Sequence, residues 1–421
     1  MTTAAVGRGT HTLTNDQSLR NRASKVIPNG MYGHMLVNER TMPGSRSYPQ
    51  FWERGEGAYV WDVDGNKYAD FMCSFGPMLL GHRDPLVEAA AARQAAVGDT
   101  LSGPSARMVE FAELLTSTVN HAEWAMFAKN GTDATASAIR VARAATGKKV
   151  FLKAAVAYHG ANEWFTPNPL GTTPEDRLNI VEFQYNDVQS LRDAVAANDG
   201  TIAAVIVTPF RHDAFVSQEA VEPAFAQEAR RLATTQGAAL ILDEVRTGFR
   251  LNVHGAWRDL GIEPDLTAFS KALANGYPIS ALVGSEPLRA AAGDIYVTGS
   301  FWCSAVPMAA GIATVSRAVE LDAPAIMRES GELFKAGFEA QALAAGLPAY
   351  LTGPVQMPIL HFADDPERRK AFAFTDAAVR HGVLLHPWHN MFLSSAHSVD
   401  VINDALERIA AAFDDLAKLT F

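Results

Sequence analysis

A carboxylate and a primary amine each follow a short apolar segment near the middle of the chain. Asp243 follows the unbroken apolar run at residues 238–242, and Lys271 comes shortly after the apolar segment 266–269. Unbroken apolar runs are typical of strands buried on both faces of a parallel sheet. Ligands of such sheets bind outside the carboxyl ends of strands. Asp243 and Lys271, 271 − 243 = 28 residues apart, are therefore candidates for one site.

One chemistry requires this pair of groups. Pyridoxal phosphate (PLP) is held as a Schiff base on a lysine, and a carboxylate keeps its ring nitrogen protonated. The lysine must become a neutral amine before it can attack or carry a proton, so it needs a desolvated or electropositive environment. The alternative is that Asp243 ends a strand and Lys271 is a solvated surface lysine. The pair alone leaves both interpretations open.

Two segments around these residues resemble the class III aminotransferases of PLP fold type I. They read DEVRTGFR at 243–250 and PDLTAFSKALANGYP at 264–278. The resemblance extends from about residue 62 to the C-terminus, with the motifs in the family's order. It implies that Asp243 is the partner of the pyridine nitrogen, that Lys271 is the Schiff-base lysine, and that Val245 also contacts the cofactor.

A helix pattern that begins at Gly131 offers a phosphate site. Gly131 lets the backbone come close to a ligand, Thr132 supplies a hydroxyl, and a helix N-terminus presents free amide donors and a positive dipole end. A plain helix start capped by threonine is the alternative. The resemblance implies that Gly131 and Thr132 bind the cofactor phosphate. It also implies that Tyr158, in the segment AYHGANEWF, stacks on the cofactor ring.

Two further residues are implied for the phosphate and the substrate. The segment TGSFWCSAVPMAAG at 298–311 resembles the family segment that crosses to the other subunit, so Ser300 is expected to reach the partner's phosphate in a homodimer with shared active sites. Arg46, in the loop PGSRSYP, could bind a substrate carboxylate in bidentate fashion, as aminomutases and β-amino acid aminotransferases do from the same loop. A solvated loop arginine is the alternative.

The chain departs from the family pattern at two places near the expected site. Thr208-Pro209 stands where many members have Glu-Pro, and Arg246 stands where a neutral residue is usual. Both differences put a specific substrate in doubt, whereas the cofactor chemistry does not depend on them. The segment around Phe301 and the C-terminal stretch LSSAHS are most similar to the glutamate-1-semialdehyde 2,1-aminomutase branch.

The composition is that of an ordinary globular protein. The chain has 421 residues, 48% of them apolar, and a net charge of 36 − 46 = −10, which does not favour nucleic-acid or anionic-membrane partners. Two cysteines give neither a disulfide framework nor a thiolate zinc site, and the twelve histidines lack a metal-binding spacing. No apolar signal core and no run of about 18 apolar residues occurs, so we expect no metal and a cytoplasmic location.

Alternating strand and helix patterns from residue 123 onward predict an α/β fold with a mainly parallel sheet. Helices are expected on both faces of this sheet, because βαβ crossovers are right-handed. We expect an N-terminal arm and active-site loop at 1–60, a large PLP domain at 61–310 and a smaller α+β domain at 311–421. This division corresponds to the PLP transferase fold type I.

The sequence therefore predicts a PLP-dependent aminotransferase that moves an amino group between an amine or amino acid and a keto acid or aldehyde. One alternative is glutamate-1-semialdehyde 2,1-aminomutase, which performs both halves on one molecule and needs no free acceptor. The other is a non-catalytic relative that only binds PLP or a partner; the presence of both Lys271 and Asp243 argues against it.

Overall fold

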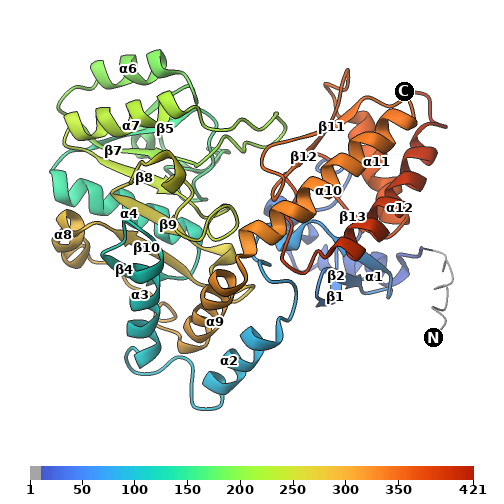
Figure 1. Ribbon diagram of the computed structural model, residues 1–421, viewed down its shortest axis with the longest axis horizontal. Helices are drawn as coiled ribbons and strands as arrows, with labels where there is room; N and C mark the ends of the chain where they lie inside the picture. The colour runs from blue at the N-terminus through green and yellow to red at the C-terminus, as the bar shows by residue number, and fades with distance from the viewer. Residues whose placement is uncertain (1–10) are drawn as a thin grey trace.

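A seven-stranded mixed sheet forms the centre of the larger part of the molecule (Figure 1). The structure is a computed structural model that describes residues 11–421, so the first ten residues of the expected N-terminal arm lie outside the described residues. Strands β9, β8, β7, β5 and β6 run parallel, whereas β10 is antiparallel to both of its neighbours, β9 and β4. In spatial order the strands are β4 (Trp124–Ala128), β10 (Ser280–Gly284), β9 (Leu266–Phe269), β8 (Ala239–Asp243), β7 (Ile202–Val207), β5 (Val150–Ala154) and β6 (Ile180–Phe183).

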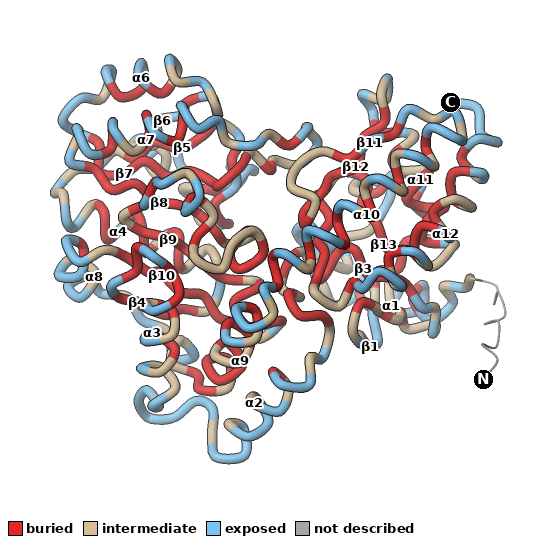
Figure 2. Tube along the Cα trace, in the orientation of Figure 1, coloured by how far each residue is buried: buried red, intermediate tan, exposed pale blue. Residues whose placement is uncertain are grey.

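Helices cover both faces of this sheet, as the sequence predicts. Successive residues of a strand point to opposite faces, and in β8 Leu240 and Leu242 join one core cluster while Ile241 joins another. The first cluster includes Phe225 of α7 (Pro223–Thr235), and the second includes Ile139 of α4 (Gly131–Thr146). Figure 2 shows the residues of the central strands as buried along their length. The other helices around the sheet are α3 (Ala106–Thr118), α5 (Pro174–Arg177), α6 (Val188–Ala196) and α8 (Arg289–Asp294).

A second, smaller part contains a four-stranded sheet built from both ends of the chain. Its order is β1 (Trp52–Glu56), β2 (Tyr59–Asp62), β3 (Lys67–Asp70) and β13 (Val383–Leu384), and β13 pairs in parallel with β3. Residues 61–70, which the sequence-based division assigned to the large domain, thus share a sheet with the C-terminal part. The expected boundary at 310 falls inside α9 (Ala305–Leu321). The division therefore remains a prediction.

The remaining elements surround this smaller sheet and connect it to the larger part. The helices are α1 (Thr14–Ala23), α2 (Pro85–Ala95), α10 (Ala323–Ala344), α11 (Arg369–Arg380) and α12 (Val399–Leu416), and β11 (Ala349–Thr352) pairs with β12 (Ile359–Phe362). Six short 3₁₀ turns are η1 (Pro28–Gly30), η2 (Gly33–Met35), η3 (Cys73–Phe75), η4 (Arg258–Leu260), η5 (Lys271–Ala274) and η6 (Glu286–Leu288). Within residues 11–421, no helix has both the length and the apolar character needed to cross a bilayer.

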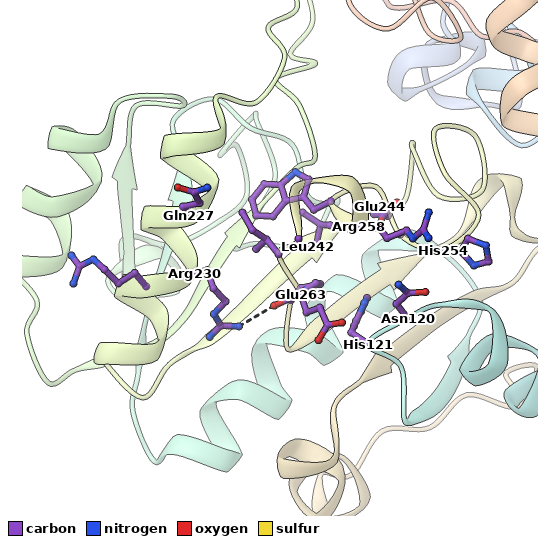
Figure 3. Close-up of a pocket in the computed structure, with 15 residues that line it drawn as sticks. Asn120, His121, Gln227, Arg230, Leu242, Glu244, His254, Arg258 and Glu263 are labelled. Atoms are coloured by element: carbon purple, nitrogen blue, oxygen red, sulfur yellow. Dashed lines mark hydrogen bonds between the residues drawn. The ribbon is translucent and has the colours of Figure 1, made fainter.

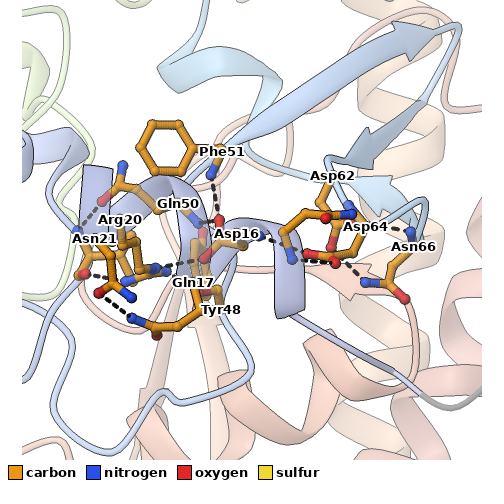
Figure 4. A network of polar contacts seen from close by, with 12 residues as sticks. Asp16, Gln17, Arg20, Asn21, Tyr48, Gln50, Phe51, Asp62, Asp64 and Asn66 are labelled. Carbon is orange, nitrogen blue, oxygen red and sulfur yellow. Dashed lines mark hydrogen bonds and ion pairs between the residues drawn. The ribbon is translucent and has the colours of Figure 1, made fainter. Parts of the chain in front are cut away.

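A polar network fixes the long loop that precedes β1 (Figure 4). The buried carboxylate of Asp16 accepts the backbone N–H groups of Gln50 and Phe51, each at 2.8 Å. It also pairs at 2.6 Å with Arg20, whose other donors reach the carbonyls of Val37 and Tyr48. Because α1 carries both Asp16 and Arg20, this helix holds the start and the end of the loop that contains Arg46.

Candidate functional site

Asp243 is the last residue of β8, and both of its carboxylate oxygens already have partners. His159 Nδ1 lies 2.7 Å from Asp243 Oδ2, and the backbone N–H of Val245 donates to Oδ1 at 3.0 Å. The Asp243 carboxylate is acceptor-only when ionised, so His159 must carry its proton on Nδ1. The other ring nitrogen of His159 is buried and has no hydrogen-bond partner among the described residues. This arrangement fixes the direction in which the carboxylate points.

Lys271 lies beside Asp243, because its strand and that of Asp243 are neighbours. Strand β9 pairs in parallel with β8, with Ala268 opposite Asp243, and Lys271 follows two residues after β9 ends. Burial lowers the pKa of Lys271 well below its usual value, and the guanidinium of Arg246 lowers it further. A lowered pKa favours the neutral amine that the expected chemistry requires.

The backbone around Lys271 adopts unusual conformations. Lys271 itself has φ = 47°, and Cys73, Ser74 and Phe75 have φ between 46° and 63°. The next residue, Gly76 (φ = 114°), has no room for a side chain, since a Cβ would lie 3.2 Å from Lys271 Cδ and 3.0 Å from the ring of Phe392. Left-handed backbone at non-glycine residues costs free energy and is concentrated at functional sites. The strain is thus located next to the reactive amine.

The first turn of α4 presents hydrogen-bond donors. Asn130 and Asp133 form a capping box, which uses the N–H groups of Asn130 and Asp133, whereas those of Gly131 and Thr132 have no partner among the described residues. Thr132 Oγ1 accepts the N–H of Ala161 at 3.1 Å, so its hydroxyl proton remains available. Two amides, a hydroxyl and the positive helix end suit a phosphate. A Cβ on Gly131 would lie 2.7 Å from Val245 Cγ1, which explains the glycine.

The sequence-predicted residues therefore fall into two sets. The structure brings together the residues expected around the PLP ring and phosphate: Gly131, Thr132, Tyr158, Asp243, Val245 and Lys271. Their groups fit PLP, with an acid for the ring nitrogen, an amine for the aldehyde carbon and donors for the phosphate. Arg46 and Ser300 are exposed, and neither side chain makes a hydrogen bond or ion pair within residues 11–421. Their expected contacts remain predictions.

The two departures from the family pattern differ in position. Thr208 is buried after β7, and its hydroxyl donates to the carbonyl of Phe210 at 2.8 Å, which gives it a local structural role. Arg246 is half-buried near Asp243 and Lys271, and burial lowers its pKa. Its Nη1 donates to the carbonyl of His212 and to Asn390 Oδ1, each at 3.1 Å.

A cavity of about 490 Å³ opens on the other side of β8 (Figure 3). Leu242 and Glu244 line it, whereas Asp243, between them, points to the opposite face. Burial raises the pKa of Glu244 to about 7. Arg230 lies at the rim and is held by Asp265 at 2.8 Å. This cavity is separate from the site around Lys271.

Sequence reasoning did not identify two residues of the site. His159 was present in the segment that contains Tyr158, and its position directly after an expected cofactor contact was the available signal. Asn390 gave no signal, because it reaches Arg246 only through the folding of the C-terminal segment, 144 residues away. Among residues 11–421, no three or more potential metal ligands come together.

Comparisons with known proteins agree with this geometry. The aminotransferase class-III family matches residues 41–417. An aminopentol aminotransferase from Sphingopyxis macrogoltabida is 50% identical over 95% of this chain and 94% of that protein. A glutamate-1-semialdehyde 2,1-aminomutase from Roseiflexus castenholzii is 34% identical over 96% and 97%. The PLP internal aldimine form of the FumI protein from a Sphingopyxis species superposes with a TM-score of 0.94, at 49% identity over 97% and 98% of the two chains. The chain belongs to the class III aminotransferases, enzymes that use PLP.

Proposed function

We propose that this aminotransferase takes its amino group from a long primary amine that has no carboxylate next to the amino-bearing carbon, and passes it to a 2-keto acid. The relative at 50% identity is an aminotransferase named for an amino alcohol, aminopentol. The observation that carries the proposal is a continuous row of aromatic rings beside Lys271, which suits an aliphatic chain better than a second charged group.

This aromatic row comprises His34, Phe75, His386, Trp388 and Phe215, which come from four different loops. Ring centroids are 4.6 Å apart for His34 and Phe75, 4.5 Å for His386 and Trp388, and 4.8 Å for Trp388 and Phe215. The row begins near the amine, because Phe75 precedes Gly76, which packs against Lys271. Its outer end at Phe215 is exposed. The row thus extends from the neighbourhood of the amine to the surface, and its rings offer apolar area over that whole length to an aliphatic chain.

The histidines of this row are uncharged at neutral pH. Burial lowers the pKa of His386 to about 3, and burial also lowers the pKa of His34. The neighbouring His389 has a pKa well below its usual value for the same reason. Neutral imidazoles supply apolar ring surface and no cation for a distal carboxylate. Each methylene buried against such a surface contributes about 0.8 kcal/mol.

The residues around Lys271 would have different roles in the reaction. PLP, when bound, withdraws electrons from the substrate carbon that carries the amino group. Asp243, oriented by His159, would hold the pyridine nitrogen protonated, and Lys271 would move the proton at the substrate carbon as general acid and base. Gly131 and Thr132 would bind the phosphate, while Tyr158 and Val245 would contact the ring. Arg46 would meet the carboxylate of the keto acid acceptor, since the proposed donor carries none beside its amino group.

We further propose a homodimer in which Ser300 completes the partner's phosphate site. Ser300 and the neighbouring apolar residues Tyr296 and Phe301 are exposed on the single chain, as is Leu101 in the adjacent segment. The two segments are joined by a hydrogen bond from Ala305 N to the carbonyl of Asp99, at 3.0 Å. Such a cluster of exposed apolar side chains is typical of an interface. The cytoplasm is the proposed compartment on composition alone.

The aminomutase alternative has support from relatives at lower identity, such as the one at 34%. An aminomutase needs no free acceptor, whereas an aminotransferase stops after one half-reaction without one. Omission of the keto acid therefore decides between them: we expect a single turnover per active site.

A chain-length series tests the donor. The holoenzyme is mixed with straight-chain primary amines from butylamine to decylamine, without acceptor, and the loss of the Schiff-base absorption band is followed. We expect kcat/KM to rise up to about fourfold per methylene, since about 0.8 kcal/mol corresponds to that factor. A flat series, with α-amino acids reacting faster than every alkylamine, would refute the proposed donor class.

A further inference from the structure

The guanidinium of Arg246 has one edge held by the protein and the other edge open. Every hydrogen bond of the Arg246 side chain uses Nη1. This nitrogen donates to the carbonyl of His212 and to Asn390 Oδ1, each at 3.1 Å, and lies 3.3 Å from the ring Nδ1 of His212. Nε and Nη2 have no partner among residues 11–421. Neither atom is fully enclosed by the protein, so both are reached by solvent. The open edge therefore faces accessible space within the site.

This cation has no anion of its own. No ion pair involves Arg246 within residues 11–421. The carboxylate of Asp243 is hydrogen-bonded to His159 and to the N–H of Val245. The carboxylate of Asp213 forms an ion pair with Arg211 at 3.0 Å. Burial lowers the pKa of Arg246, although the charges of Asp243 and Asp213 act in the opposite direction; neither carboxylate forms an ion pair with the guanidinium. A half-buried, unpaired cation is costly and is a common feature of functional sites.

Arg250, four residues later, is an arginine in the same region whose terminal nitrogens are all hydrogen-bonded within the protein. It is fully buried, and its two terminal nitrogens donate to the carbonyls of Leu393, Gly76 and Met78. Both terminal nitrogens are thus satisfied by the backbone, and only Nε, which is fully enclosed, lacks a partner. Arg246 differs because an entire edge, Nε with Nη2, is left for a ligand.

We propose that the Nε–Nη2 edge of Arg246 binds the carboxylate of the 2-keto acid acceptor and of the amino acid formed from it. The two parallel N–H groups of this edge match a carboxylate in bidentate geometry, whereas a phenolate or hydroxyl oxygen would use only one of them. The phosphate site at the start of α4 is built from other groups. His212 and Asn390 hold the guanidinium so that its open edge stays directed into the site.

This inference rests on the proposed function in one respect, the 2-keto acid as acceptor. It explains how one site could serve two unlike substrates. The aromatic row would bind the chain of the amine, and Arg246 would bind the acid group of the acceptor. Because the two substrates occupy the site in turn, the amine needs no carboxylate and the keto acid needs no long aliphatic chain.

The test measures binding directly, with an unreactive pair of probes. Propionate and its uncharged isostere propionamide are titrated calorimetrically into the holoenzyme, as wild type, Arg246→Gln, Arg246→Lys and Arg231→Gln. Arg231, on the exposed side of α7, controls for the loss of one positive charge. We expect Arg246→Gln to weaken propionate binding by about 10- to 100-fold with propionamide unchanged. Arg246→Lys should fall between, and Arg231→Gln should match the wild type.

Three outcomes would overturn the assignment. Equal loss of propionate and propionamide binding would show a scaffold role for Arg246. Unchanged propionate binding, together with a shift of the cofactor's visible absorption band, would assign the edge to the cofactor's phenolate oxygen. If Arg246→Gln fails to fold, a crystal structure of the wild-type holoenzyme with propionate decides: the carboxylate must lie against Nε and Nη2, and any other position contradicts the proposal.

The half-reactions separate this inference from the proposed donor. Arg246→Gln should slow the acceptor half-reaction with pyruvate by about 10- to 100-fold more than it slows the donor half-reaction with hexylamine, because the change in the pKa of Lys271 affects both half-reactions alike whereas the carboxylate contact affects only the first. If alkylamines prove to be poor donors, the donor proposal fails while the propionate result still stands. If pyruvate reacts normally with the variant, the carboxylate contact fails while the chain-length series is unaffected.

Discussion

His159 Nδ1 and Asp243 Oδ2 lie 2.7 Å apart, although 84 residues separate them in the chain. Both side chains are buried, and the second oxygen of Asp243 is fixed by the N–H of Val245. A carboxylate held in this way keeps its orientation when a ring nitrogen approaches it. We infer that His159 positions the carboxylate of Asp243 and would act on the cofactor only through it.

Removal of the hydrogen bond between His159 and Asp243 should reduce turnover without loss of the bound cofactor. For His159→Phe we expect kcat to fall about 10- to 100-fold, because a hydrogen bond to a charged group is worth about 1.5–3 kcal/mol. The absorption spectrum of the bound cofactor should change its pH dependence, which a loss of packing alone would not cause. His159→Gln, which retains a donor, should recover part of the loss. A normal spectrum and normal turnover in His159→Phe would contradict the role.

Asp243→Asn should separate cofactor binding from cofactor chemistry. The amide can keep the hydrogen bond to the backbone N–H of Val245 but cannot stabilise a protonated pyridine nitrogen. We expect the variant to retain PLP, measured by absorbance after gel filtration, and to lose most of its turnover. Near-normal rates would count against Asp243 as the partner of the ring nitrogen.

Lys271 should carry the cofactor covalently. Burial and the nearby Arg246 lower the pKa of Lys271, which favours the neutral amine that forms a Schiff base. Borohydride reduction of the holoenzyme, followed by peptide mass spectrometry, should place the label on Lys271. A label on any other lysine refutes the assignment, and Lys271→Ala should show no fixed cofactor after the same treatment.

Glu244 should make stability depend on pH. Its pKa is raised by burial from 4.5 to about 7, so the folded protein holds this proton more tightly than the unfolded chain does. The stabilisation is fully present below about pH 4.5 and is lost as the pH rises through about 7. Glu244→Gln should therefore match the wild type in stability near pH 4 and exceed it at pH 8, by up to about 3 kcal/mol in the free energy of unfolding, which is followed through the Tm.

A surface glutamate provides the control for that comparison. Glu56 is two-thirds exposed, so Glu56→Gln should leave the pH dependence of Tm unchanged. A difference between Glu244→Gln and the wild type that is constant from pH 5 to pH 8 would show that the carboxyl does not titrate in this range.

Arg46 remains the arginine that the sequence alone proposed for a substrate carboxylate. Its side chain is exposed, in a loop that is fixed through Ser47 to Asp376 of α11. Arg46→Ala should reduce kcat/KM for carboxylate substrates more than for simple amines, measured in the two half-reactions. Equal loss for both substrate classes would remove Arg46 from the substrate site.

The sequence by itself determined the local elements, the family and the cofactor that the family uses. The apolar runs gave β4, β5, β7, β8, β9 and β10, and the pattern at 131–146 coincides with α4, because burial on both sheet faces and amphipathic periodicity leave direct traces in residue order. The motifs around Asp243 and Lys271 identified the family for the same reason: their chemistry needs those residue types at strand ends.

Only the tertiary structure decided which distant residues meet. The antiparallel direction of β10 and the contact of Asp243 with His159 depend on strand order within the large sheet. The pairing of β3 with β13 and the contact of Arg246 with Asn390 depend on how the C-terminal segment folds back onto earlier parts of the chain. Strand order and loop packing arise from long-range burial, which no local pattern records. For that reason the sequence could name candidates for the chemical step, whereas it could not name the residues that contact and orient those candidates.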